Sequence, residues 1–171
     1  GLALHLWGDE RLPRRAFLWR LVDEVGPLDL KGEMWARASV RIGNLYSLMV
    51  LAVSELPVDD SWRADFTKDS ASSALSLYSR AKEHRPLWRV AQSNTAMLRA
   101  WMGRTEESLR ILDELASFRV DKETMPFSLK RAMVLCDAGR RDDCLEELAR
   151  IPEELMDARA KRFRAQLEAL R

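Results

Sequence analysis

One short stretch recurs along the chain and limits what it can fold into. Residues 74–86 read Ala-Leu-Ser-Leu-Tyr-Ser-Arg-Ala-Lys-Glu-His-Arg-Pro, an amphipathic pattern with small residues, one aromatic residue and a closing proline. The small residue Ala74 is followed by Ser108 after 34 residues and by Cys144 after a further 36, with apolar residues behind each. A repeat with a period near 34 residues is typical of stacked helical solenoids. The sequence therefore predicts an all-α fold built from successive pairs of helices.

Composition supports a folded helical protein and argues against one class of partner. Of 171 residues, 47% are apolar and 32% charged, which is typical of soluble globular proteins and argues against extended disorder. Only 7 glycines and 6 prolines interrupt a chain rich in helix-forming residues. The net charge of +1 gives no basic excess that would displace the counterions of phosphates, so we expect no nucleic-acid partner.

Helix starts and stops divide the chain into five parts. Glycine and proline mark the breaks, and apolar residues three and four apart mark the helices between them. The expected parts are an N-terminal flanking segment (1–30), a first repeat (31–86) with an insertion (57–69), a second repeat (87–120), a third repeat (121–151) and a C-terminal capping helix (152–171). The insertion is polar and is expected to be a loop.

With these helices placed, the chain resembles the tetratricopeptide repeat family. Residues 42–46, Ile-Gly-Asn-Leu-Tyr, match the first-helix line of that family, and the small, aromatic and proline residues of 74–86 match its second helix. The corresponding places in the next units hold Ala96, Gly103, Ser108, Leu112 and Leu115, and then Ala132, Gly139, Cys144, Leu148 and Ile151. The resemblance implies a right-handed α-solenoid of antiparallel helix pairs with flanking and capping helices, in which small residues permit close helix approach.

The first unit departs from this pattern. Gly43 and Ala74 lie 31 residues apart, whereas the equivalent residues of the later units lie 12 apart, so the first unit carries 19 extra residues. Two aromatic residues, Trp62 and Phe66, stand in this insertion among four aspartates. They either pin the insertion onto the preceding helix or anchor a partner protein.

The residues that could carry chemistry are few. The two histidines lack metal-type partners at ligand spacing, and no phosphate-binding glycine loop or nucleophile motif occurs. We therefore expect no enzyme activity, no catalytic or metal-binding residues and no cofactor. The two cysteines, Cys136 and Cys144, are either buried thiols or bonded to each other across a helix hairpin, and only geometry decides between these.

The family resemblance implies a binding groove on the concave face of the solenoid. By that resemblance the groove would be lined by Asn44, Asn94, Met97, Trp101, Lys130 and Met133. Asn44, Asn94 and Lys130 occupy positions at which some family members bind the C-terminal carboxylate of a peptide. Two further positions that are basic in those members hold Val40 and Pro126 here. An apolar groove with methionines suits a helix or an extended peptide. Alternatively, these residues contact the terminal helices of the chain itself.

We therefore expect a non-enzymatic scaffold that binds another protein or peptide. The apolar residues 2–7, followed by Arg11, Arg14 and Arg15, fit the cytoplasmic end of a membrane anchor, or else a short apolar helix packed on the domain. We expect a cytoplasmic location, with the periplasm as the alternative. An anchored chain would lie at the cytoplasmic face of the inner membrane and would suit a complex for polysaccharide export or secretion. Alternative hypotheses are a ligand-sensing or autoinhibitory module, and self-association through the C-terminal apolar seam Met156, Ala160, Phe163, Leu167 and Leu170.

Overall fold

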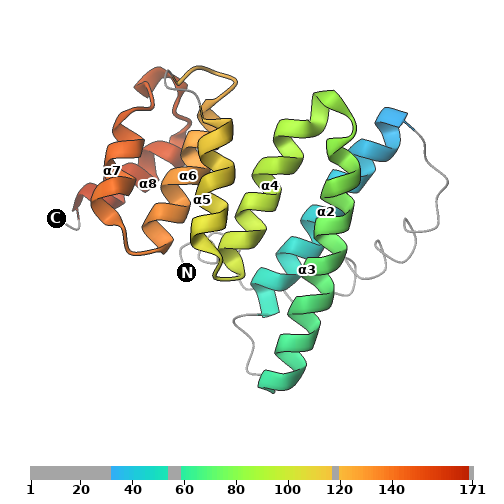
Figure 1. Ribbon diagram of the computed structural model, residues 1–171. Coiled ribbons are helices and arrows are strands. Elements are labelled where there is room, and N and C mark those ends of the chain that lie inside the picture. Colours follow the sequence, from blue (N-terminus) through green and yellow to red (C-terminus); the bar gives the residue numbers. More distant parts are fainter. Residues whose placement is uncertain (1–31, 54–58, 117–119, 170–171) are drawn as a thin grey trace. The chain divides into compact units, whose positions relative to one another are not determined.

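The described part of the chain is helical, as the repeat predicts. The computed structural model describes residues 32–53, 59–116 and 120–169, and among these no residue forms a β-strand (Figure 1). The α-helices are α2 (Gly32–Val53), α3 (Asp60–Lys82), α4 (Trp88–Trp101), α5 (Thr105–Leu115), α6 (Met125–Asp137), α7 (Arg141–Ala149) and α8 (Ala158–Ala169), with 3₁₀ turns η1 (Arg85–Leu87) and η2 (Glu153–Leu155). The apolar residues 2–7 and the rest of the N-terminal flanking segment lie outside the described residues. No helix within the described ranges is long and apolar enough to cross a membrane.

The chain forms two compact units, Gly1–Asn94 and Thr95–Arg171. In the first unit α2 and α3 lie side by side (Figure 1). Their contact is close because Gly43 of α2 leaves room for the ring of Tyr78, and Tyr78 is almost completely buried. Small residues of α3 complete the contact, since Ala71, Ala74 and Ala81 are also fully buried. Gly43, Ala74 and Tyr78 therefore lie where these two helices meet.

The second unit has its own apolar core. Helices α5, α6 and α7 pack in succession, and α8 packs against α7. The fully buried members of this core include Ala96, Leu112, Ala132, Leu135, Cys144 and Leu148. Gly103 and Gly139 close the turns after α4 and α6 with φ angles of 77° and 74°, a conformation that glycine adopts without strain. The prediction that these glycines end helices is confirmed.

The expected loop at 57–69 is wrong for its described residues beyond position 59. Residues 60–69 are helical and form the first turns of α3, which project beyond the end of α2 (Figure 1). Asp59 is the N-cap of the helix, and its carboxylate accepts hydrogen bonds from the backbone N–H groups of Ser61 and Trp62. Four aspartates and a serine suggest a loop, yet the same residue types also start helices.

The C-terminal helix also starts later than expected. Residues 153–155 form only a 3₁₀ turn, and α8 begins at Ala158, where the carboxylate of Asp157 accepts a hydrogen bond from the N–H of Ala160. The described members of its apolar seam belong to the core of the second unit: Met156, Ala160 and Leu167 are buried, and Phe163 packs against them. Leu170 lies outside the described residues. Within the described residues, the seam therefore faces the protein's own core.

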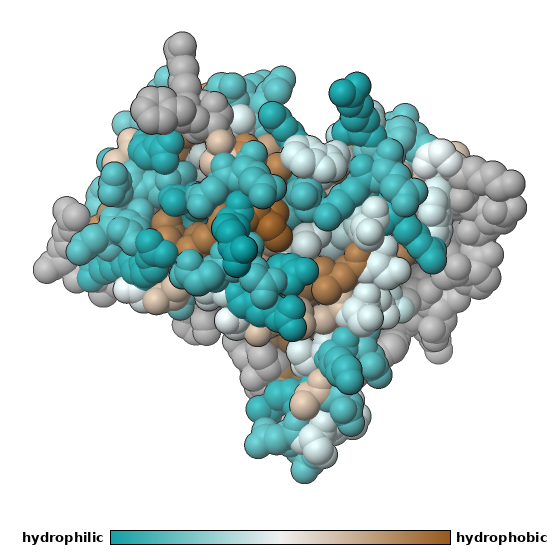
Figure 2. All heavy atoms as spheres, viewed as in Figure 1, coloured by the Kyte–Doolittle hydropathy of each residue, from teal (hydrophilic) through white to brown (hydrophobic). Residues whose placement is uncertain are grey.

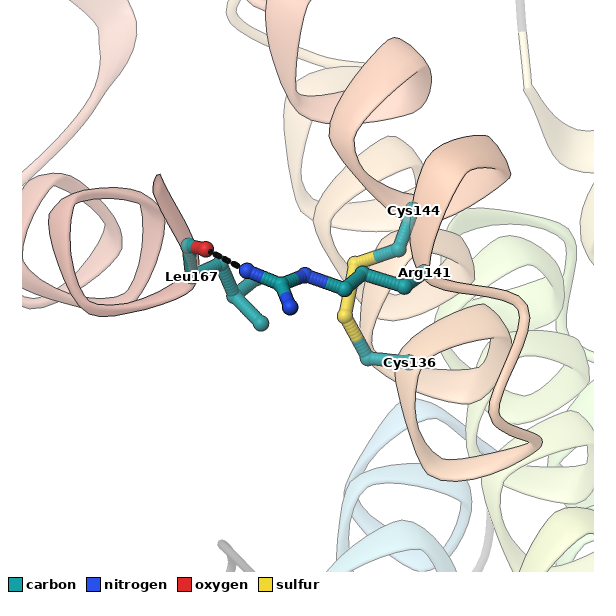
Figure 3. The surroundings of a disulfide bond; sticks show 4 residues. All are labelled: Cys136, Arg141, Cys144 and Leu167. Atoms are coloured by element: carbon teal, nitrogen blue, oxygen red, sulfur yellow. Dashed lines mark hydrogen bonds between the residues drawn. A yellow bond between two sulfur atoms is a disulfide. The ribbon is translucent and has the colours of Figure 1, made fainter. Parts of the chain in front are cut away.

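A disulfide joins α6 to α7. The Sγ atoms of Cys136 and Cys144 are bonded, with the two Cα atoms 5.4 Å apart on either side of the turn at Gly139 (Figure 3). Next to it, the guanidinium of Arg141 donates a hydrogen bond to the backbone carbonyl of Leu167 in α8 (Figure 3). The hairpin of α6 and α7 is thus closed covalently, and α8 is tied to the start of α7.

An ion network connects α5, α6 and α7. The guanidinium of Arg131 binds Asp113 through Nε at 2.6 Å and Glu147 through Nη1 at 2.8 Å. Arg150 binds the same oxygen of Glu147 at 3.0 Å. Only 1% of the Glu147 side chain is exposed, and a buried carboxylate requires such partners.

Candidate protein-binding site

Two of the residues expected in the groove are bonded to each other in the first unit. The side-chain oxygen of Asn44 accepts hydrogen bonds from the hydroxyl of Tyr78 and from Nδ2 of Asn94, each at 2.8 Å. The three residues come from α2, α3 and α4, and both asparagines are half-buried. The pair of amides therefore ties helices of the first unit together.

The protons of this cluster can be assigned by counting. Tyr78 has one hydroxyl proton, which it donates to Asn44, so the hydroxyl of Ser47 must donate at the Tyr78 oxygen 2.9 Å away. The carbonyl of Gly43, also 2.9 Å from the Ser47 hydroxyl, competes for that same proton. Burial raises the pKa of Tyr78 to about 12, and the bond from Ser47 opposes this only in part. The phenol therefore stays neutral, and the cluster has a structural role.

The other four residues expected in the groove belong to the second unit. Met97 is buried in its core, and Trp101 packs against that core from the end of α4. Met133 and Lys130 are half-buried and lie three residues apart on α6, so they share one helix face. The two larger apolar side chains of this set, Met97 and Trp101, are thus engaged in packing.

The amine of Lys130 is held in a poorly solvated place. Burial lowers the pKa of this side chain from 10.5 to about 8. A lysine in such a place is mostly charged at neutral pH but is held there at a cost in stability.

Of the two aromatic residues of the insertion, Trp62 is exposed and Phe66 is half-buried. Trp62 and Phe66 lie one turn apart on the projecting start of α3, and their rings stack with centroids 5.0 Å apart. The side chain of Trp62 remains 48% exposed. Figure 2 shows this projection as a mainly hydrophilic surface with small apolar areas. A stacked and exposed aromatic pair of this kind is typical of the anchor residues of protein interfaces.

The first turns of α3 bury none of their own side chains. The buried residues of α3 begin at Ser70 and continue through Ala71, Ala74, Tyr78 and Ala81, which contact the rest of the unit. Within residues 60–69, Arg63, Phe66 and Thr67 are half-buried and the other seven residues are exposed. Most of this helical extension is therefore open to solvent.

Two acidic residues complete this surface and were not distinguished from their neighbours by sequence. Asp65 and Asp69 follow Trp62 at spacings of three and seven residues, so together with Phe66 they lie along one face of α3. Both aspartates are exposed. The spacing was readable in the sequence, but it carries meaning only when residues 60–69 are helical. We call these four residues, Trp62, Asp65, Phe66 and Asp69, the aromatic–acidic stripe.

The described residues show no arrangement for metal chemistry, since no group of three or more histidine, cysteine, aspartate or glutamate side chains is placed to hold an ion. The disulfide also uses both cysteines. Comparisons with known proteins give no match to a protein-family model, a curated protein or a solved structure.

Proposed function

We propose that this chain is a non-enzymatic, solenoid-like helical repeat domain that binds a partner protein. The observation that carries the proposal is the projecting start of α3, where Trp62 stacks on Phe66 and remains 48% exposed. Stacked aromatic side chains offer a large contact area at a low cost in side-chain entropy. The groove is the second choice, because Asn44 and Asn94 are bonded to each other and Met97 lies in the core.

Site-specific photo-cross-linking distinguishes the two surfaces. A photoreactive phenylalanine analogue is placed at position 62, at position 101, or at the exposed control position 142, and the chain is irradiated in the cells that naturally produce it. We expect a specific cross-linked protein from position 62 only. Cross-links from position 101 alone would move the binding surface to the groove, and no cross-link from either position would contradict a protein-binding function.

We propose further that the domain works in an oxidising compartment, with the bacterial periplasm as the fitting example. The supporting observation is the disulfide between Cys136 and Cys144, since such bonds persist in oxidising compartments and are rare in the cytosol. Of the locations expected from the sequence, this favours the periplasm over the cytoplasm.

Thiol labelling tests this location. Cells that produce the chain are quenched with acid, and the denatured protein is treated with a maleimide reagent before and after reduction. We expect no labelled cysteine before reduction and two labelled cysteines after it. Labelling of both cysteines before reduction would contradict an oxidising location.

A further inference from the structure

The aromatic–acidic stripe has a chemical character that selects a class of partner. Residues 59–69 contain four aspartates against Arg63 and Lys68, which gives this segment a net charge of −2 in a chain whose net charge is +1. The stripe lies roughly 140° around α3 from the line of buried side chains, given 100° per residue. It therefore points away from the packed side of the first unit.

The four aspartates of the segment do not have the same role. Asp59 caps the helix, and Asp60 pairs with Arg63 at 3.1 Å. Asp65 and Asp69, in contrast, are exposed and form no hydrogen bond or ion pair within the described ranges. The carboxylates of Asp65 and Asp69, next to the aromatic pair, are thus the two in this segment whose charge is not paired within the described residues.

We infer that the aromatic–acidic stripe binds a basic, arginine-bearing segment of a partner protein; this inference rests on the proposed function. A guanidinium group can stack on the face of Trp62 and bind a carboxylate through two N–H groups at the same time, whereas an ammonium group cannot form this planar double contact. Asp65 and Asp69 stand one turn apart on either side of Phe66, so arginines at helical spacing meet both.

The same charges argue against two other classes of partner. Nucleic acids and anionic membrane surfaces both attract basic residues and would be repelled by exposed carboxylates. A neutral apolar partner would gain from the aromatic rings but would leave two carboxylates to be desolvated without a counter-charge. A cationic segment is the occupant that can contact both the aromatic rings and the carboxylates of the stripe.

Binding of a defined peptide tests the inference. The probe is a fluorescein-labelled, alanine-based helical peptide whose arginines follow the three- and four-residue spacing of the stripe, and fluorescence anisotropy reports its affinity for the full chain. We expect the affinity to fall about tenfold or more in the double variant Asp65→Asn/Asp69→Asn and in Trp62→Leu. Trp62→Phe, which keeps an aromatic face, should retain most of it.

Matched controls exclude attraction by charge alone. The double variant Asp142→Asn/Glu146→Gln removes two exposed acids at helical spacing from α7, and we expect it to bind the peptide as the unaltered chain does. A peptide with glutamine in place of each arginine should not bind, and one with lysine should bind more weakly. Equal affinities for the stripe variant and the α7 variant would overturn the inference, as would binding of the glutamine peptide.

The failure of this inference can be distinguished from the failure of the proposed function. A cross-link from position 62 combined with no binding of the arginine peptide would leave a protein-binding surface but remove the basic partner. Self-association through the stripe, detected as a dimer by light scattering and lost in Trp62→Leu, would replace the basic partner with a second copy of the chain and would also overturn the inference.

Discussion

At the scale of single residues, the closest fit is between Gly43 and Tyr78. A Cβ atom at position 43 would lie 2.7 Å from Cε1 of the Tyr78 ring, closer than real side chains approach. The ring cannot move away easily, because it is buried and its hydroxyl is held by Asn44 and Ser47. Glycine is therefore required here for space, although its backbone conformation is that of an ordinary helix.

Gly43→Ala should destabilise the first unit. We expect a loss of about 1–2 kcal/mol in the free energy of unfolding, because overpacking of roughly 1–3 kcal/mol is offset in part by the better helix propensity of alanine. Urea denaturation measures the loss. In a Tyr78→Leu background the clash is relieved, so the same substitution should there be neutral or stabilising; an equal loss in both backgrounds would contradict a clash with the ring.

Lys130 gives the chain a dependence of stability on pH. Its pKa is lowered from 10.5 to about 8, so between these values the folded protein has already lost a proton that the unfolded chain still holds. The contribution of this group to stability is therefore unfavourable below about pH 8 and is relieved as the pH rises towards 10.5.

Lys130→Met should remove this cost. We expect the free energy of unfolding to increase by about 1–3 kcal/mol near neutral pH and the gain to diminish above about pH 9, measured by urea denaturation across the pH range. The control is Lys122→Met at an exposed position. A gain that does not change with pH would mean that the substitution acts through packing and that the charge of Lys130 is not the cause.

The sequence predicts some residue roles and not others, for physical reasons. The spacing of small residues in the sequence singles out Ala74 and Cys144, and both are fully buried. Asn44 and Asn94 are 50 residues apart, and their mutual hydrogen bond depends on a tertiary contact that no local pattern contains. A sequence does not distinguish an exposed asparagine from one that is hydrogen-bonded within the protein, so the role of Asn44 and Asn94 requires the structure.

At the scale of helices and hairpins, we expect the two sides of the ion network to differ in how much stability their removal costs. Arg131→Met would leave the buried carboxylate of Glu147 with Arg150 as its one remaining partner, and we expect a loss of about 3 kcal/mol in the free energy of unfolding. Glu147→Met should cost less, because Arg131 is partly exposed and still binds Asp113. Denaturation of the two variants, with the surface substitution Asp113→Asn as the control, checks the order. Equal losses would argue against a cost from the buried charge.

The disulfide should stabilise the α6–α7 hairpin. It closes a short loop, with a sequence separation of 8, and closing such a loop restricts the unfolded chain by about 2.5 kcal/mol. We expect reduction to lower the free energy of unfolding by this order, measured by guanidinium denaturation with and without a reductant. The variant Cys136→Ser/Cys144→Ser should not respond to the reductant; a similar response in that variant would mean that the reductant acts elsewhere.

The positions of α4 to α7 were predictable from the sequence, and the starts of α3 and α8 were not. Apolar periodicity and the two turn glycines place α4 to α7 because each signal lies within the helix or next to it. The starts of α3 and α8 were misplaced for a common reason. Asp59 and Asp157 bind backbone N–H groups at the starts of helices. An aspartate in a polar stretch is equally typical of a loop, because its side chain can bind nearby backbone N–H groups there too. The residue type alone therefore does not distinguish a helix start from a loop.

At the scale of the whole molecule, we expect the second unit to fold as an independent domain. Its apolar core is drawn entirely from residues between Ala96 and Leu167. We therefore expect a fragment that begins at Arg85 to fold alone and to lose its helical circular dichroism signal in one cooperative thermal transition. Leu135→Asp, which places a charge at a fully buried position, serves as the unfolded reference. A gradual transition like that of the reference would contradict an independent core.

The disulfide also affects how the chain responds to a protease. Arg140 and Arg141, which directly follow Gly139 in the turn between α6 and α7, lie inside the covalently closed loop, and Arg140 is exposed. Exposed turns are preferred sites of cleavage, and trypsin-like proteases cut after arginine. A cut at this turn would break the backbone but release nothing, because the two pieces stay joined through sulfur. In a compartment rich in proteases, the bond would let the domain survive a cut after the exposed Arg140.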